Sequence, residues 1–328
     1  MLLAGLTGLG AYLGVLAILE SLELTALIFP RYIADPLEGV HFGRARGPFV
    51  EAAANGLAMH VCGVAAAVGL ATWRSRRARV AAGVVVALCA LGLLLTLTRQ
   101  IWLGATVATF VAMLCTRRLR RYALPAVVAA AVLVVVALAA VPGLRDSASG
   151  RASDERPIWD RLNSNRAAVD MVLDRPLLGF GWYSWREHSA DYYTQADDYP
   201  VTTVGRPHNV VLSNAVELGI PATLLWLAAL ALAVGGAALS RAPPELEPWR
   251  IGMIAIFINW FVISNFTPLA YAFPNYIVWL WAGVVLSGSL RPGAFARYTG
   301  AAASMRSRTS ASRAVSAQGA ASGLGRRS

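Results

Sequence analysis

The sequence is poor in charged residues and contains no lysine. Charged residues make up 14% of its 328 positions, against roughly 25% in an average soluble domain, and all 29 basic residues are arginine. Several stretches of about 17 to 25 residues carry almost no charge, which is enough for a helix to cross the ~30 Å hydrocarbon core of a bilayer. With 57% hydrophobic residues, the composition excludes a soluble enzyme and a disordered chain and predicts a multi-pass membrane protein.

Cysteines are also few, and no metal-ligand spacing is present. Cys62, Cys89 and Cys115 lie in apolar stretches, where cysteine usually serves as a small buried hydrophobic residue. A disulfide-stapled secreted domain is therefore excluded. No acidic cluster could convincingly hold Mg²⁺ or Mn²⁺, so we expect neither a metal nor another cofactor. The N-terminus lacks the basic region of a cleaved signal peptide, and we expect its first apolar run to remain as a helix.

The position of the arginines is more informative than the net charge of +11. Four arginines crowd each of the short loops 74–79 and 116–121, and short arginine-rich loops mark the cytoplasmic side of a membrane. We therefore interpret the basic balance as membrane topology and not as nucleic-acid binding. This topology puts both chain ends in the cytoplasm and puts 30–50, the turn 98–100 and the long stretch 142–207 outside.

The predicted fold is all-α, a polytopic membrane helical bundle with a large external, partly helical loop. Apolar runs predict about eight transmembrane helices, at roughly 3–29, 51–73, 80–97, 100–115, 122–141, 209–239, 251–267 and 270–290. The expected organisation is five membrane helices in 1–141, an external segment in 142–207 and three membrane helices in 208–290. A disordered cytoplasmic tail is expected in 291–328, where Ala, Ser, Gly and Arg dominate.

The external segment is long enough to fold, and it lacks the basic excess of the inner loops. Its eight arginines and ten acidic residues give it a net charge of −2. The stretch 161–173 predicts an amphipathic helix that ends before Pro176 and Gly179. Its apolar positions are Leu162, Ala168, Val169, Val172 and Leu173. Several aromatic residues follow, at Trp182, Tyr183, Trp185, Tyr192, Tyr193 and Tyr199. Aromatics near a membrane commonly form an interfacial belt, and a sugar-stacking platform is the alternative.

Three arginines are candidates for an anion site on the outer side. Arg99 stands between two apolar runs, where it could extend to the membrane interface, but ionisable groups at helix ends in a bundle usually face a cavity or a partner. Arg161 and Arg166 lie five apart on the external helix, and each alone could simply be solvated and paired with a nearby carboxylate. Guanidinium groups offer a permanent charge and forked donors that suit phosphate oxygens.

Polar residues also mark the point where the chain re-enters the membrane. His208 and Asn209 stand at the start of an apolar run, and either could be only a capping residue. Histidine has an ordinary pKa of about 6.5, which suits proton transfer near neutral pH. Glu217 lies within the apolar run, where a carboxylate is costly enough to indicate a partner or a role. Several guanidiniums and one imidazole at an outer interface indicate metal-independent glycosyl transfer from a lipid pyrophosphate.

Motifs at four places carry a family resemblance. His208-Asn209 is followed after nine residues by Gly219, and Arg161 stands fifteen residues before Pro176. The other stretches are DRPLLGFG at 174–181 and TRQIWL at 98–103, with a weaker likeness in GRARGPF at 43–49. In order and spacing, these stretches resemble the O-antigen ligase and polymerase superfamily of bacterial membrane glycosyltransferases across roughly residues 40–290. Asn165 and Ala222 depart from the family pattern, which has Trp and more commonly Gly at these positions.

The resemblance implies a fold like that of GT-C-type glycosyltransferases. It also implies transfer of a glycan from an undecaprenyl-pyrophosphate carrier to an acceptor hydroxyl at the outer face of the bacterial cytoplasmic membrane. By this analogy Arg99 and Arg161 would bind the pyrophosphate and His208 would activate the acceptor, so these three are the catalytic candidates. The further candidates for substrate binding are Arg166, Asn209, Glu217, Arg44 and Arg46. The partners would be a lipid-linked oligosaccharide donor and a glycolipid, protein or wall-polymer acceptor.

The sequence does not separate a glycan ligase from a polysaccharide polymerase of the same family. A glycolipid or solute transporter is the alternative from a different class. Transporters tend to place charged groups near the membrane midplane and to show internal repeats, whereas here most charge lies at the outer interface and no repeat is evident. A non-catalytic scaffold in a cell-envelope complex is the third interpretation.

Overall fold

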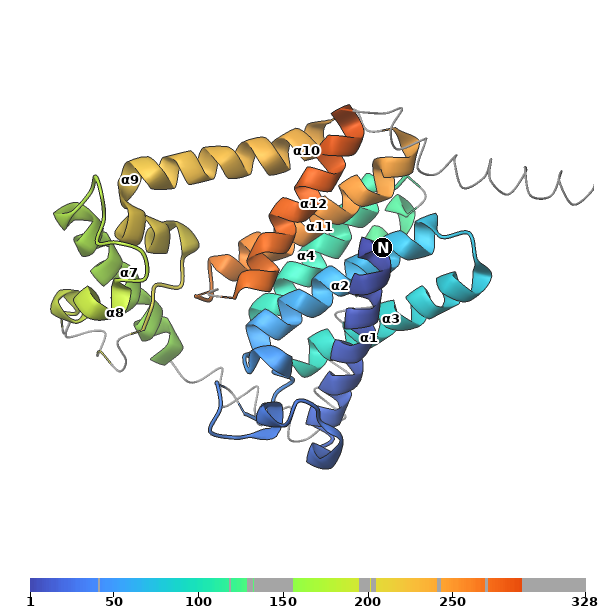
Figure 1. Ribbon diagram of the computed structural model, residues 1–328, viewed down its shortest axis with the longest axis horizontal. Helices are drawn as coiled ribbons and strands as arrows, with labels where there is room; N and C mark the ends of the chain where they lie inside the picture. The colour runs from blue at the N-terminus through green and yellow to red at the C-terminus, as the bar shows by residue number, and fades with distance from the viewer. Residues whose placement is uncertain are drawn as a thin grey trace, which may run out of the picture.

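The computed structural model describes residues 1–40, 42–117, 119–128, 132, 156–194, 201, 205–240, 243–268 and 271–290. Within these ranges the regular structure is entirely helical, which confirms the predicted all-α class. A helical bundle and a smaller lobe stand apart, and one long helix runs between them (Figure 1). The lobe consists of residues 156–194 and 205–218.

The bundle is formed by α1 (Leu2–Ser21), α2 (Ala52–Thr72), α3 (Arg76–Leu95), α4 (Arg99–Cys115), α11 (Glu247–Ser264) and α12 (Ala272–Leu290). Helix α2 is central, since it packs against each of the other five, and every residue from Ala52 to Cys62 is buried. Its small side chains allow neighbouring backbones to come close, as in other membrane helix pairs. A Cβ added at Gly10 of α1 would lie only 2.8 Å from the Cβ of Cys62.

Five helices are long and apolar enough to cross a membrane, which supports a polytopic membrane protein. They are Leu2–Ser21, Ala52–Thr72, Arg76–Leu95, Val210–Leu239 and Pro244–Ser264. The predicted spans 100–115 and 270–290 are also helices, but shorter apolar ones. The predicted span 122–141 is helical over 120–128, and most of its remainder lies outside the described residues, as does the predicted tail 291–328. The count of eight spans therefore remains a prediction.

The first span is shorter than predicted. Helix α1 ends at Ser21 and not near residue 29, and short 3₁₀ turns follow at Thr25–Leu27, Arg31–Ala34 and Gly47–Phe49. The side chain of Glu20 accepts hydrogen bonds from the backbone N–H groups of Arg46 at 3.1 Å and Gly47 at 3.0 Å. This carboxylate at the end of α1 therefore anchors the loop that contains Arg46 and Gly47.

The helix predicted over 161–173 is confirmed as α7 (Arg156–Asp174), and it packs against the start of α9 (Val210–Leu230). Its predicted buried face is wrong at three positions, because Leu162, Val169 and Leu173 are exposed. The buried side consists of Met171 and four smaller residues, Asn163, Ser164, Ala167 and Ala168. Small side chains are needed there because Trp185 of α8 (Trp185–His188) and Val216 of α9 pack into the same core.

Helix α9 consists of two segments joined at a break. At Gly219 the backbone has φ 79° and ψ 168°, a conformation that is essentially restricted to glycine. Two residues later Pro221 has no N–H to donate, so the carbonyl of Glu217 loses its helical partner. The first segment belongs to the lobe, and the second extends through a π-helical turn (Ala231–Gly235) into α10 (Gly236–Leu239), which packs on α12 (Figure 1).

Residues 174–181 supply the hydrogen bonds that the break removes. The N–H of Phe180 donates to the carbonyl of Val216 at 2.9 Å, and the N–H of Gly181 donates to that of Glu217 at 3.0 Å. In return, the N–H of Ile220 donates to the carbonyl of Pro176 at 2.8 Å. We call these three bonds the backbone lock. Two stretches that the sequence presents as separate motifs therefore form one structural unit.

Replacing Gly219 by alanine is expected to destabilise the protein, because the new Cβ would lie 2.2 Å from the carbonyl oxygen of Leu177. The unfavourable backbone conformation alone costs about 1–3 kcal/mol for an L-residue. We expect the thermal unfolding midpoint of the detergent-purified protein to fall by at least ~2 °C. Gly283→Ala in α12 is the control, because a Cβ there meets nothing within 4 Å. Equal unfolding midpoints for the two variants would show that the backbone lock contributes little to the stability of the protein.

Candidate functional site

The three residues proposed as catalytic come from three separate elements. Arg99 is the first residue of α4, Arg161 lies near the start of α7, and His208 directly precedes the cap of α9. Burial and then the charge of Arg99 lower the pKa of Arg161. Burial and then the charge of Arg161 lower the pKa of His208. The fold thus brings Arg161 within electrostatic reach of both Arg99 and His208.

The groups around Arg161 lack partners of their own. Within the described residues, Arg161 Nε, Asn165 Oδ1 and His208 Nδ1 are buried without a hydrogen-bond partner. Arg161 and Asn165 stand one turn apart on α7, so their side chains share a face. Buried polar atoms in native proteins are nearly always paired, and several unpaired ones at one place are a feature of ligand sites.

The described residues leave the charges of Arg99 and Arg161 without a carboxylate partner. Among the residues that the structure describes, neither guanidinium forms an ion pair. Like charges held near each other repel, and an anion with several oxygens between them would remove that repulsion. The group of Arg99, Arg161 and His208 therefore suits a polyanionic ligand such as a pyrophosphate.

Arg44 and Arg46 lie apart from this group, in the loop that covers the end of the bundle. The guanidinium of Arg46 is 1% exposed and donates to three backbone carbonyls between residues 33 and 38, at 2.5–3.1 Å. Arg44 lies close enough to Glu51 to lower the pKa of that carboxyl, against the larger effect of burial, and Glu51 caps α2. These contacts favour a structural role for both arginines, and their assignment to substrate binding remains a prediction.

The structure gives different environments to Arg166 and Asn209. Arg166 is exposed on α7, on a side away from the buried core of the lobe. Asn209 caps α9, since its Oδ1 accepts from the N–H groups of Val211 at 2.9 Å and Leu212 at 3.0 Å. The capping alternative is thus confirmed for Asn209, and substrate binding by either residue remains a prediction.

The partner of Glu217 is Arg206, which the sequence did not single out. Arg206 Nη2 lies 3.2 Å from Glu217 Oε1, and the exposed fractions of the two side chains are 22% and 6%. The guanidinium of Arg206 also lies over the ring of Tyr183, 4.7 Å from its centroid. The sequence indicated that a carboxylate at position 217 needs a partner, but Arg206 comes from outside the helix, where helical spacing gives no signal.

The low pKa of His208 determines its protonation state. Burial and Arg161 lower this pKa to about 4, and Asp160 acts weakly in the opposite direction. The imidazole is therefore neutral at pH 7, which is the form that accepts a proton. A bound anion would offset the charge of Arg161 and raise the pKa, so the histidine would become a stronger base when the site is occupied.

The charge of the site suits an anion and not a divalent cation, since two guanidiniums would repel a metal ion. Within the described residues, no group of three His, Cys, Asp or Glu side chains could hold a metal.

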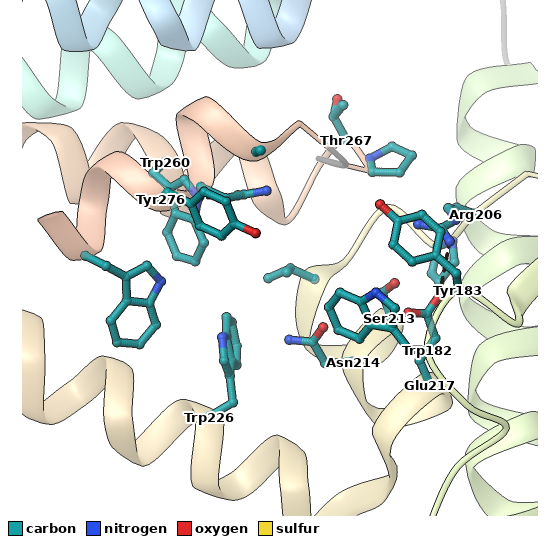
Figure 2. A pocket seen from close by; sticks show the side chains of 16 residues that line it. Trp182, Tyr183, Arg206, Ser213, Asn214, Glu217, Trp226, Trp260, Thr267 and Tyr276 are labelled. Atoms are coloured by element: carbon teal, nitrogen blue, oxygen red, sulfur yellow. Dashed lines mark hydrogen bonds and ion pairs between the residues drawn. The ribbon is translucent and has the colours of Figure 1, made fainter.

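A cavity of about 270 Å³ opens between the lobe and the bundle, with Tyr183 and Glu217 on one side and Trp226 and Trp260 on the other (Figure 2).

The pKa of His208 can be measured through its reaction with diethyl pyrocarbonate, because only the neutral imidazole reacts. We expect the rate of modification to fall with acidification at a midpoint near pH 4. In Arg161→Gln the midpoint is expected to rise, because one neighbouring positive charge is removed. Mass spectrometry identifies the peptide that carries the adduct, and N-acetylhistidine is the reference. A midpoint near 6.5 in the wild type would show that His208 is neither desolvated nor close to Arg161.

Comparison with known proteins assigns this part of the chain to a family. Residues 84–227 match the family model described as O-Antigen ligase. The match runs from within α3 past the break in α9, so it contains Arg99, Arg161 and His208 but neither Arg44 nor Arg46. No curated protein matches the chain. The match supports the resemblance found in the sequence: residues 84–227 of this membrane protein are similar to the O-antigen ligase family.

Proposed function

We propose that the protein is a glycosyltransferase that transfers a glycan from an undecaprenyl-pyrophosphate carrier to an acceptor hydroxyl, as a glycan ligase. The observation that carries the proposal is the meeting of two unneutralised guanidiniums, Arg99 and Arg161, with the neutral imidazole of His208. The family match supports glycan transfer as the type of activity. In this proposal the lobe lies outside the bacterial cytoplasmic membrane and both chain ends lie in the cytoplasm.

The two arginines would hold the carrier pyrophosphate and stabilise it as the leaving group. When the bond between the anomeric carbon and the pyrophosphate oxygen breaks, negative charge increases on that oxygen. Fixed positive groups aimed at a developing charge stabilise the transition state more than the ground state. Arg161 suits this task because it is half-buried and makes no ion pair in the described structure, so its donors are available.

His208 would act as the general base. Its neutral imidazole takes the proton from the acceptor hydroxyl while the acceptor oxygen forms the new bond to the anomeric carbon. The carrier pyrophosphate leaves with the electron pair of the broken bond, and the imidazolium later releases its proton to water. The positive charge formed on His208 lies beside the bound anion, which stabilises it.

Loss of either group should abolish transfer without loss of the protein. We expect His208→Ala and Arg161→Ala to lower transfer at least ~100-fold, which is the usual range for a general base. Arg186→Ala is the matched control, because Arg186 is an exposed arginine of the same lobe outside the site. The measurement is mass spectrometry of carrier-linked glycans in a deletion strain that carries each variant, with immunoblotting of membranes to confirm equal expression.

Unconsumed carrier-linked glycan should accumulate with both site variants and disappear with the wild type and the control. Long accumulated chains would indicate a missing ligase, and single repeat units would indicate a missing polymerase. Near-normal consumption of the glycan by both site variants would contradict the mechanism and would redirect attention to transport of a glycolipid.

A further inference from the structure

One face of the first segment of α9 borders the cavity between the lobe and the bundle. Val210, Ser213, Asn214 and Glu217 all line this cavity, and their spacing places them on the same side of the helix. Pro207 lines it too, directly before His208. The cavity therefore lies next to the proposed base.

The other wall of the cavity begins beside Arg99. Thr267 lines the cavity, and its hydroxyl accepts a hydrogen bond from the side chain of Gln100, the residue that follows Arg99. A group attached to a pyrophosphate at Arg99 and Arg161 would thus reach the cavity without crossing the bundle. The cavity lining therefore includes a chain neighbour of His208 and the hydrogen-bond partner of the residue next to Arg99.

Six of the sixteen residues that line the cavity are aromatic, and they come from both walls. They are Trp182, Tyr183, Trp226, Trp260, Tyr276 and Trp279. Tyr183 has φ 64°, a left-handed conformation that costs an L-residue free energy, and the guanidinium of Arg206 lies over its ring. Strained residues of this kind are concentrated at ligand-binding sites, and Arg206 holds Tyr183 at the cavity.

Polar groups stand among these rings without partners. Figure 2 shows Asn214 between the ring of Trp226 and Ser213. In the part of the chain that the structure describes, neither the Asn214 amide nor the Ser213 hydroxyl makes a side-chain hydrogen bond. An amide can donate and accept at once, so it can bind two neighbouring hydroxyl groups. An isoprenoid tail would leave these polar groups buried against hydrocarbon, at a cost in free energy.

We propose that this cavity is a saccharide subsite that binds the sugar ring attached to the carrier pyrophosphate. The apolar faces of the sugar stack on the aromatic rings, and Asn214 binds its hydroxyl groups, so Asn214 helps to determine which glycan is accepted. A volume of about 270 Å³ is near the lower end for ligand pockets and suits one or two rings. This inference rests on the proposed glycosyl transfer.

The test is a titration of the purified full-length protein with the free oligosaccharide that mild acid releases from the host's carrier lipid. Tryptophan fluorescence reports binding, since four tryptophans line the cavity. We expect Asn214→Ala to weaken binding about tenfold, for the loss of two neutral hydrogen bonds. Trp226→Ala should weaken it similarly, and Trp226→Phe should retain most of it. Leu224→Ala, an exposed residue of the same helix, is the control.

A second titration uses undecaprenyl pyrophosphate without sugar. We expect Asn214→Ala to bind it as the wild type does and Arg161→Ala to bind it weakly. Unchanged oligosaccharide affinity in Asn214→Ala and Trp226→Ala would overturn the subsite, and so would a loss of sugar-free lipid binding in both variants. Failure of the proposed function is a separate result, in which His208→Ala and Arg161→Ala still consume the carrier-linked glycan. Thermal midpoints equal to the wild type confirm that the subsite variants are folded.

Discussion

The arrangement of the site depends on the backbone lock at the break in α9. A continuous helix from Val210 to Leu239 would extend past the bundle without closing on α7. The break at Gly219 turns the first segment of α9 into the lobe, and residues 174–181 satisfy the backbone groups that the break exposes. Because those residues directly follow α7, the lock also fixes α7 against α9. Backbone hydrogen bonds therefore hold Arg161 and His208 near each other, and neither side chain takes part in those bonds.

The same arrangement leaves two guanidinium groups close together, and a bound anion would neutralise their charge. The fold neutralises several of its other arginines internally, with carbonyls around Arg46 and with carboxylates at Arg206 and Arg250. Arg99 and Arg161 are left near each other without such neutralisation in the described structure, and burial together with the charge of Arg161 lowers the pKa of His208. A bound pyrophosphate would relieve the repulsion and raise the basicity of the histidine in the same step. Binding and activation of the acceptor would then be coupled through one guanidinium.

The sequence predicted the elements of this fold better than their contacts. Hydropathy located the membrane helices, and the 3.6-residue pattern located α7, because both signals are local. The pattern wrongly predicted that Leu162, Val169 and Leu173 are buried. The side of α7 that is buried carries mostly smaller residues, which leave room for Trp185 and Val216. The early end of α1 and the partner of Glu217 depend on hydrogen bonds between distant segments. Spacing within one segment does not report such bonds. The grouping of Arg99, Arg161 and His208 could be expected only from the family resemblance and from the topology predicted for the three residues.

The most direct test of the central claim is whether Arg99 and Arg161 bind one pyrophosphate together. The measurement is the Kd of undecaprenyl pyrophosphate for the purified wild type, Arg99→Ala, Arg161→Ala and the double variant. A charge-assisted hydrogen bond contributes about 1.5–3 kcal/mol, so each single change should weaken binding roughly 10- to 100-fold. The two losses should not add, because both side chains contact the same ligand. Wild-type affinity in either single variant would contradict a shared pyrophosphate site.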